Sequence, residues 1–250
     1  MKCTEAGIFL QKNILSRTDS TCNLFIKMHI SARYISYKAA RNWYANLKLV
    51  KPTPQDPPFK HVVQIGDPTL RQVAVKLYED EIGTPEIQFL IKRLKYVFKK
   101  YNCVGLSAPQ IGASFQILLA EFNHDHLKIY SKKEIESKEI TLQPETVIIN
   151  PVMKVLDYNK VIFSESCESV KGFYADVPRY RKIELKGLTE EGKPISLIAQ
   201  GWWARILQHE IDHLNGKLYT DIMEPKTLTC SCWNIVNERG GRVQIPFGHQ

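Results

Sequence analysis

The chain has 250 residues, of which 44% are hydrophobic, and its formal net charge is +8. This composition allows one domain of about 150–200 residues with a full hydrophobic core. No apolar run approaches the roughly 20 residues that a membrane span requires. The charge is uneven, because residues 1–50 carry eight Lys or Arg and two acids, whereas residues 51–250 carry 26 and 24. The near-neutral remainder gives no strong signal for nucleic-acid binding.

The first segment, residues 1–50, is basic and has no acid between Asp19 and Asp56. Serines and aromatic residues are interleaved in it, a composition typical of mitochondrial or plastid presequences. We therefore expect an organellar, mitochondrial matrix location, with Met28 as an alternative start; a basic tail that contacts RNA or membrane is the rival interpretation. Residues 51–60 contain four prolines and predict an extended linker.

The folded domain is expected to span residues 61–235, with a C-terminal tail at 236–250. Apolar residues at helical spacing, or runs rich in β-formers, predict these elements: a helix at 84–100, strands at 115–122, 146–157 and 161–170, a hairpin at 182–199 and a helix at 202–214. Residues 123–145 are charged and predict a surface excursion in which His124 and His126 are solvated. Because the strands come in groups, we expect an α+β fold with antiparallel or mixed strands packed around a central helix.

The six cysteines do not have the spacing of a disulfide framework. We therefore expect a reducing compartment, in which thiolates are free to bind metal. Cys230 and Cys232 form a C-x-C pair without a second pair elsewhere, so we interpret them as part of a surface tail rather than as a zinc site.

The helix predicted at 202–214 contains the sequence QHEIDH. His209 and His213 are four residues apart, on one helix face, and can direct nitrogens at a single ion. Glu210 is rotated about 100° from His209, which is the position of the water-activating carboxylate in an H-E-x-x-H motif. This short motif also arises by chance, so its interpretation depends on matching parts elsewhere.

Two other segments supply such parts. Cys167, in ESCES, has polar neighbours, unlike a structural cysteine. One thiolate with two imidazoles would leave a fourth metal position open, as in catalytic sites. Gln110, in GLSAPQ, follows a rigid Ala-Pro pair, and its amide is a suitable fixed donor for a developing oxyanion.

The ordered segments VGLSAPQIG, ESCES and QHEIDHLNG resemble the three signature motifs of peptide deformylases. GDPTLRQVA resembles the usual start of that family, so the resemblance covers about residues 60–225. It implies a hydrolase that removes the formyl group from N-formylmethionine of new polypeptides and releases formate. It also implies one divalent metal, commonly Fe²⁺ with Zn²⁺ or Co²⁺ as substitutes. The expected partners are nascent chains at the organellar ribosome, and a homodimer is left open.

Carried over residue by residue, the resemblance implies three metal ligands: Cys167, His209 and His213. Glu210 would be the acid and base, and the side chain of Gln110 and the backbone N–H of Glu168 would be the oxyanion donors. Four residues would line the substrate edge or pocket: Gly105, Glu165, Ser166 and Ile206. For Ile206 we favour a place in the core over a place in the pocket.

The chain departs from the bacterial pattern at four positions. Cys103 stands in place of a glycine, Ser107 in place of an alanine and Glu168 in place of a leucine. These three changes resemble the mitochondrial branch of the family and agree with the presequence interpretation. Ser166 replaces a glycine and is less familiar, although its carbonyl can still pair with a peptide.

Two other functions compete with this one. An H-E-x-x-H metalloprotease would take a third ligand downstream of the helix, and Glu224, Glu238 and His249 are the candidates. A non-catalytic module that binds RNA or the ribosome would use the basic N-terminal segment as its arm. Cleavage of internal peptides would indicate the protease, and salt-sensitive RNA binding would indicate the binding module.

The remaining residues of the second helix have weaker interpretations. Asp212 would orient a histidine or lie in solvent. Arg205 would contact the peptide or, as we favour, pair with an acid. Trp202 and Trp203, at the helix start, are expected to contribute to packing.

Overall fold

The structure is a computed structural model that describes residues 56–247. These residues belong to one unit of the chain, Pro54–Gln250. The predicted presequence, residues 1–50, and the first half of the predicted linker lie outside the described residues. Phe59 is buried and its N–H donates to the Ile111 carbonyl at 2.8 Å, so the chain is packed against the domain from this point. Within the described residues, no helix is long and apolar enough to cross a membrane.

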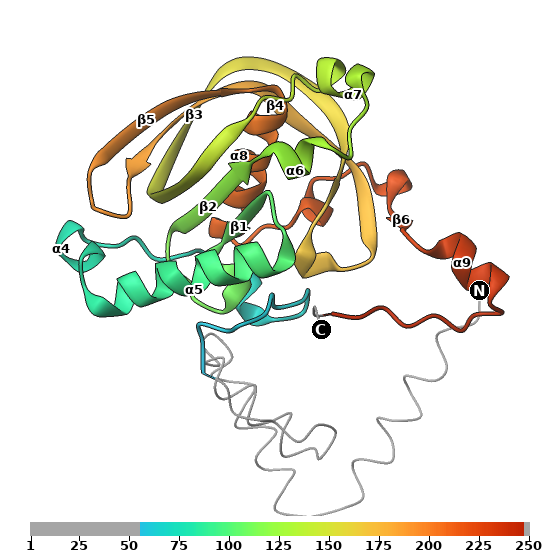
Figure 1. Ribbon diagram of the computed structural model, residues 1–250, viewed down its shortest axis with the longest axis horizontal. Coiled ribbons are helices and arrows are strands. Elements are labelled where there is room, and N and C mark those ends of the chain that lie inside the picture. The colour runs from blue at the N-terminus through green and yellow to red at the C-terminus, as the bar shows by residue number, and fades with distance from the viewer. Residues whose placement is uncertain (1–55, 248–250) are drawn as a thin grey trace, which may run out of the picture. The chain divides into compact units, whose positions relative to one another are not determined.

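A six-stranded antiparallel sheet forms the centre of the fold (Figure 1). Its strands are β1 (Gly105–Ser107), β2 (Ile117–Phe122), β3 (Gln143–Ser166), β4 (Phe173–Leu188), β5 (Pro194–Gln200) and β6 (Thr229–Cys230). The strand order is β1-β2-β3-β4-β5, and β6 pairs with β4. The pairings between these strands are antiparallel, and the predicted α+β class is confirmed.

β3 is a single strand of 24 residues, so the prediction of two strands at 146–157 and 161–170 is wrong. The residues between the two predicted strands include the polar Asp157 and Asn159. In the structure, the β3–β4 register shifts at these residues, but the strand does not end there. The pairing continues to Ser166, which lies opposite Tyr174. The strand therefore ends directly before Cys167, and the residues that follow form the 3-10 turn η3 (Glu168–Val170).

Helix α8 (Gly201–Leu214) lies inside the curve of the sheet, as predicted (Figure 1). Its apolar side chains pack with those of β2, β3, β4 and β5 in one core cluster. Gly201 has φ +60°, and a Cβ there would come within 2.5 Å of Glu139 Cβ, so this helix start requires glycine. Trp203 is buried, as expected of a packing residue.

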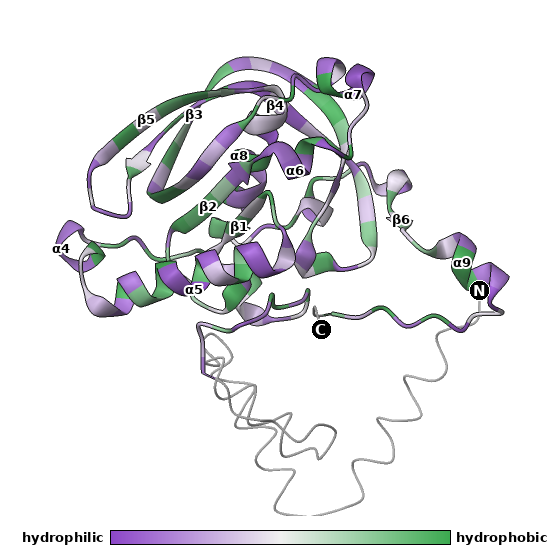
Figure 2. Cartoon of the chain, viewed as in Figure 1, coloured by the Kyte–Doolittle hydropathy of each residue, from purple (hydrophilic) through white to green (hydrophobic). Residues whose placement is uncertain are grey.

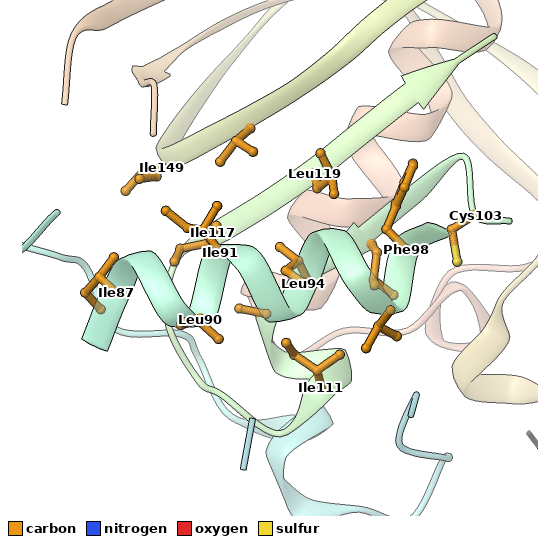
Figure 3. Packing of buried hydrophobic residues seen from close by; sticks show 14 of the residues in the cluster. Ile87, Leu90, Ile91, Leu94, Phe98, Cys103, Ile111, Ile117, Leu119 and Ile149 are labelled. Atoms are coloured by element: carbon orange, nitrogen blue, oxygen red, sulfur yellow. The ribbon is translucent and has the colours of Figure 1, made fainter. Parts of the chain in front are cut away.

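Helix α5 (Pro85–Tyr101) covers a second core cluster, and Figure 2 shows hydrophobic and hydrophilic residues alternating along it. The strand β2 separates the two clusters. Its residues Ile117 and Leu119 point to α5, as Figure 3 shows, whereas Leu118 and Ala120 belong to the cluster around α8. Because both faces of β2 are buried, the strand reads as a continuous apolar run rather than as an alternating one.

The predicted excursion at 123–145 contains two short helices. The smaller helical elements of the described chain are η1 (Pro68–Arg71), α4 (Glu79–Ile82), η2 (Ala108–Ile111), α6 (His124–Leu127), α7 (Lys132–Ser137), η4 (Tyr219–Asp221), η5 (Pro225–Thr227) and α9 (Trp233–Glu238). His126 is buried, so its prediction as a solvated residue is wrong. Its Nδ1 accepts from the N–H of Asn123 at 3.2 Å, and its ring packs on Phe122, which folds the imidazole back onto the domain.

The cysteine pair near the C-terminus is not a free tail. Cys230 lies in β6 and pairs with Phe173 of β4, and the N–H of Ser231 donates to the Gly172 carbonyl at 2.8 Å. The sulfurs of Cys230 and Cys232 are 3.5 Å apart and partly exposed. The segment is thus tied to the turn that follows Cys167.

Candidate metal centre and active site

Two histidines and one cysteine converge in the structure. His209 and His213 project from one face of α8, with ring centroids 5.0 Å apart. Cys167 follows β3, and its ligand atom and those of the histidines all lie within 4.8 Å of one another. Cys167 Sγ is 3.3 Å from His213 Nε2. Two ligand atoms of one tetrahedral zinc-like centre lie about 3.5 Å apart, so this donor set fits a single divalent ion.

A buried carboxylate holds His209 in place. Glu165, two residues before Cys167, accepts a hydrogen bond from His209 Nδ1 at 3.0 Å, which leaves Nε2 free for an ion. Arg179 donates to both Glu165 oxygens at 2.9 Å, and Arg205 donates to one at 2.6 Å. Burial alone would raise the pKa of Glu165, but its bonds with His209 and Arg179 outweigh burial and hold that pKa well below its ordinary value.

The same network accounts for two helix residues. Arg205 pairs with an acid, as favoured from sequence, and also donates to the carbonyls of β3 and β4. Asp212 pairs with Arg179 rather than with a histidine, so it acts on the site through the arginine. Among the described residues, His213 Nδ1 has no hydrogen-bond partner.

Glu210 lies beside the two histidines and is buried. Its Oε2 has no hydrogen-bond partner among the described residues. Burial raises the pKa of this carboxyl to about 7. A Cβ on Gly105 would lie 2.4 Å from Glu210 Oε1, so the absence of a side chain at this position in β1 makes room for the carboxylate.

The amide of Gln110 is fixed from both ends. Its Oε1 accepts hydrogen bonds from the N–H and the hydroxyl of Ser107, at 2.9 and 3.1 Å. The Nε2 group is thereby turned toward Ser169 Oγ, at 3.2 Å, and toward Cys167 Sγ, at 3.5 Å. A buried, oriented N–H₂ group therefore lies beside the candidate ligand Cys167.

A short extended segment, residues 63–65, forms hydrogen bonds with both turns of the site, a role that was not predicted. The N–H of Val63 donates to the Gln110 carbonyl at 2.9 Å, and the N–H of Ile65 donates to the Ser169 carbonyl at 2.7 Å. Gln64 lies between these two residues, and its side-chain amide donates a hydrogen bond to the carbonyl of Glu168 in η3. The carboxylate of Glu168 pairs with Lys171 at 2.7 Å, which neutralises its charge at the edge of the site.

A cavity of about 330 Å³ opens beside these residues. The four residues predicted for the substrate edge or pocket all line it: Gly105, Glu165, Ser166 and Ile206. Four further lining residues had no predicted role in substrate binding: Cys103, Tyr130, Lys138 and Trp202. Burial raises the pKa of the Cys103 thiol, so this lining residue is uncharged.

An H-E-x-x-H helix, a cysteine from a neighbouring strand and an adjoining cavity define a metal-dependent hydrolase. The sequence profile of the polypeptide deformylase family matches residues 59–228, and the chain belongs to that family. Its activity is the metal-dependent removal of the formyl group from N-formylmethionine.

Relatives and solved structures agree with this assignment. The mitochondrial peptide deformylase of Homo sapiens is 40% identical over 198 residues, which cover 79% of this chain and 82% of that protein. The chloroplastic peptide deformylase 1A of Solanum lycopersicum is 36% identical over 91% of this chain and 79% of its own length. The peptide deformylase of Synechococcus elongatus, solved with actinonin, has a TM-score of 0.55 and 28% identity, over 78% of this chain and 93% of that one.

Proposed function

We propose that this deformylase holds Fe²⁺ between Cys167, His209 and His213 and acts on nascent chains in the mitochondrial matrix. The convergence of the three ligand atoms within 4.8 Å of one another carries the proposal. Thiolate and imidazole donors suit iron, zinc and cobalt. A divalent ion bound there supplies Lewis-acid chemistry, which polarises a carbonyl and acidifies water.

Glu210 is the proposed proton carrier. Its buried Oε2 takes a proton from the water that attacks the formyl carbon and later delivers it to the methionine nitrogen, which leaves as a free amine with release of formate. Gln110 Nε2 and the N–H of Glu168 donate to the oxyanion that develops on the formyl oxygen. Losing one such donor raises a barrier by about 2.7–4 kcal/mol.

The substrate is proposed to lie along the cavity. Gly105 and Ser166 line the cavity, where the peptide backbone would pass, and Ile206 lies one turn before His209, where an apolar side chain would pack. A deformylase from Acinetobacter baumannii has been solved with Met-Ala-Ser bound, at a TM-score of 0.57 and 25% identity, over 65% of this chain and 96% of that one. This supports the binding of a methionine-initiated peptide.

Glu210→Gln provides the decisive test. The protein is purified without oxygen, its metal content is measured, and formate release from a formyl-methionyl tripeptide is followed. The variant should retain metal and lose activity by about 100-fold or more, whereas Cys167→Ala should lose metal. Glu224→Gln is the matched control, because Glu224 is a third ligand only in the rival protease. Full activity in Glu210→Gln would contradict the role of Glu210 as proton carrier. Unchanged metal content in Cys167→Ala would contradict the role of Cys167 as a metal ligand.

The matrix location rests on composition and on relatives. The human relative is named mitochondrial, the tomato relative chloroplastic, and a 41% identical Arabidopsis thaliana relative both, which points to an organelle. Residues 1–58 fused to a fluorescent reporter should direct it to the mitochondrial matrix; a cytosolic or plastid signal would contradict this. Ribosome association and a homodimer are tested by co-sedimentation and by light scattering of the full chain.

A further inference from the structure

One end of the cavity is formed by a lysine that is surrounded by aromatic rings. Lys138 Nζ lies 4.7 Å from the ring centroid of Trp202, 4.8 Å from that of Tyr130 and 5.8 Å from that of Phe163. Lys138, Tyr130 and Trp202 all line the cavity that contains the candidate metal ligands. A cation over ring faces is attracted to their π electrons and is held in place.

This ammonium group differs from the other charges of the cavity. Arg205 pairs with Glu165, and Glu168 pairs with Lys171. Lys138 forms no ion pair with any carboxylate of the described chain, although its backbone carbonyl accepts from the N–H of Trp202 at 2.9 Å. Glu134, four residues earlier, interacts with this charge electrostatically but forms no ion pair with it, so the positive charge at this end of the cavity is only partly offset.

Trp202 and His209 are separated along α8 by slightly more than the length of an extended formyl-methionine side chain. Trp202 is seven residues before His209 on α8, about 10 Å along the helix axis, with Ile206 between them on the same face. Five bonds separate a formyl carbon from the thioether sulfur of its methionine, which spans about 6 Å when extended, and the terminal methyl reaches about 8 Å. With the formyl group at the proposed metal centre, an extended thioether side chain would point from Ile206 toward Trp202 and Lys138.

Trp202 offers a second indication of what this end binds. Its indole Nε1 is buried and has no hydrogen-bond partner among the described residues. Buried donors without partners are rare, and a thioether sulfur is a weak acceptor. A positive charge and an unsatisfied donor both favour an electron-rich group and disfavour a second cation.

We propose that Lys138 is a specificity-determining residue: its ammonium group, held by Trp202 and Tyr130, accepts the neutral thioether of a formylated first residue and rejects a cationic side chain. This proposal rests on the proposed function of the cavity. Lys138 would discriminate between substrates by charge repulsion, which disfavours a first residue with a cationic side chain. Carboxylate side chains of similar length should be tolerated better than ammonium side chains.

The test compares kcat/KM of the full, metal-loaded chain for four formylated tripeptides that differ only in the first residue: methionine, norleucine, lysine and glutamate. Lys138→Met should raise the rate on formyl-lysine relative to formyl-methionine by about tenfold. Lys138→Glu should raise it further and lower the rate on formyl-glutamate, whereas Lys138→Arg should keep the wild-type order. Lys133→Met is the matched control, because Lys133 lies exposed on α7, the helix that Lys138 directly follows.

The outcomes separate the two proposals. Wild-type protein without activity on formyl-methionine would contradict the proposed function itself. Activity on formyl-methionine combined with an unchanged lysine-to-methionine ratio in Lys138→Glu would overturn only the role of Lys138. Thermal unfolding of each variant, compared with Lys138→Arg, shows whether a change in ratio comes from a folded enzyme.

Discussion

Gln64 and Glu168, 104 residues apart in the chain, are joined by a hydrogen bond of 2.7 Å from Gln64 Nε2 to the Glu168 carbonyl. The other end of the same amide accepts from the N–H of Lys171 at 3.3 Å. One side chain therefore bridges the 3-10 turn that carries the proposed oxyanion donor, the N–H of Glu168. Turns of this kind keep a fixed orientation only when neighbouring groups hold them.

Replacing Gln64 by methionine, which has a similar length and no amide, should lower kcat by about tenfold and leave KM nearly unchanged. The reason is that misalignment of one donor affects the oxyanion more than the bound substrate, and a tenfold change equals about 1.4 kcal/mol of barrier. Steady-state formate release measures both parameters. Gln72→Met, at an exposed position, is the control. A rise in KM with kcat preserved would show that Gln64 serves binding instead.

Gly105→Ala should remove most of the activity without removing the metal. The new Cβ would lie 2.4 Å from Glu210 Oε1 and 2.9 Å from its Cδ, so the carboxylate must move away from the reacting water. We expect a loss of about 100-fold in kcat/KM, with metal content unchanged by elemental analysis. Gly83→Ala is the control, because a Cβ there meets no atom within 4 Å. Wild-type turnover in Gly105→Ala would show that Glu210 tolerates displacement.

Glu165→Gln should weaken metal binding, because His209 loses the carboxylate that orients it. Replacing a partner of this kind typically costs about 10–100-fold in metal affinity. Arg179 also loses a buried partner, and breaking a buried ion pair costs about 3–5 kcal/mol of unfolding free energy. Competition with a chelator measures the first effect and urea unfolding the second. The same change at Glu184, whose pair with Lys186 is more exposed, should alter neither property much.

Acid should weaken the fold in part through Glu139. Hydrogen bonds from Arg181 and Gln200 lower the pKa of Glu139 below its ordinary value of 4.5. Because the folded-state pKa is depressed, the stabilisation is complete above the unfolded pKa and is lost as the pH falls through the folded value. The difference in unfolding free energy between wild type and Glu139→Gln should thus be small but measurable near neutral pH and should shrink in acid. A difference in unfolding free energy that grows in acid would contradict the lowered pKa of Glu139 in the folded state. Comparing the two proteins cancels the loss of metal that both undergo.

Sequence was informative where the signal is local. The spacing of His209 and His213 fixes their shared face on any helix, and the apolar period of α5 fixes its buried side. Cys167 could be joined to them only through the family resemblance, since nothing in its own neighbourhood specifies which residues it meets. The matched positions in the three motifs then converged in the structure.

The partners of Glu165 could not be read in the same way. Arg179 reaches it from β4 and Arg205 from α8, and these contacts depend on the β3–β4 register and on how the helix packs against the sheet. A shift of one residue in the β3–β4 register would turn Arg179 to the opposite face of the sheet. Gln64 escaped notice for a related reason, because a single amide in an extended segment carries no periodic signal.

The double burial of β2 has a consequence for how the domain opens. Leu118 and Leu119 are neighbours that enter different clusters, so the strand cannot separate from one cluster while remaining seated in the other. In deuterated solvent, their amide protons should exchange only when the whole domain unfolds, later than those at the helix ends. The two halves of the interior are thereby joined into one cooperative unit.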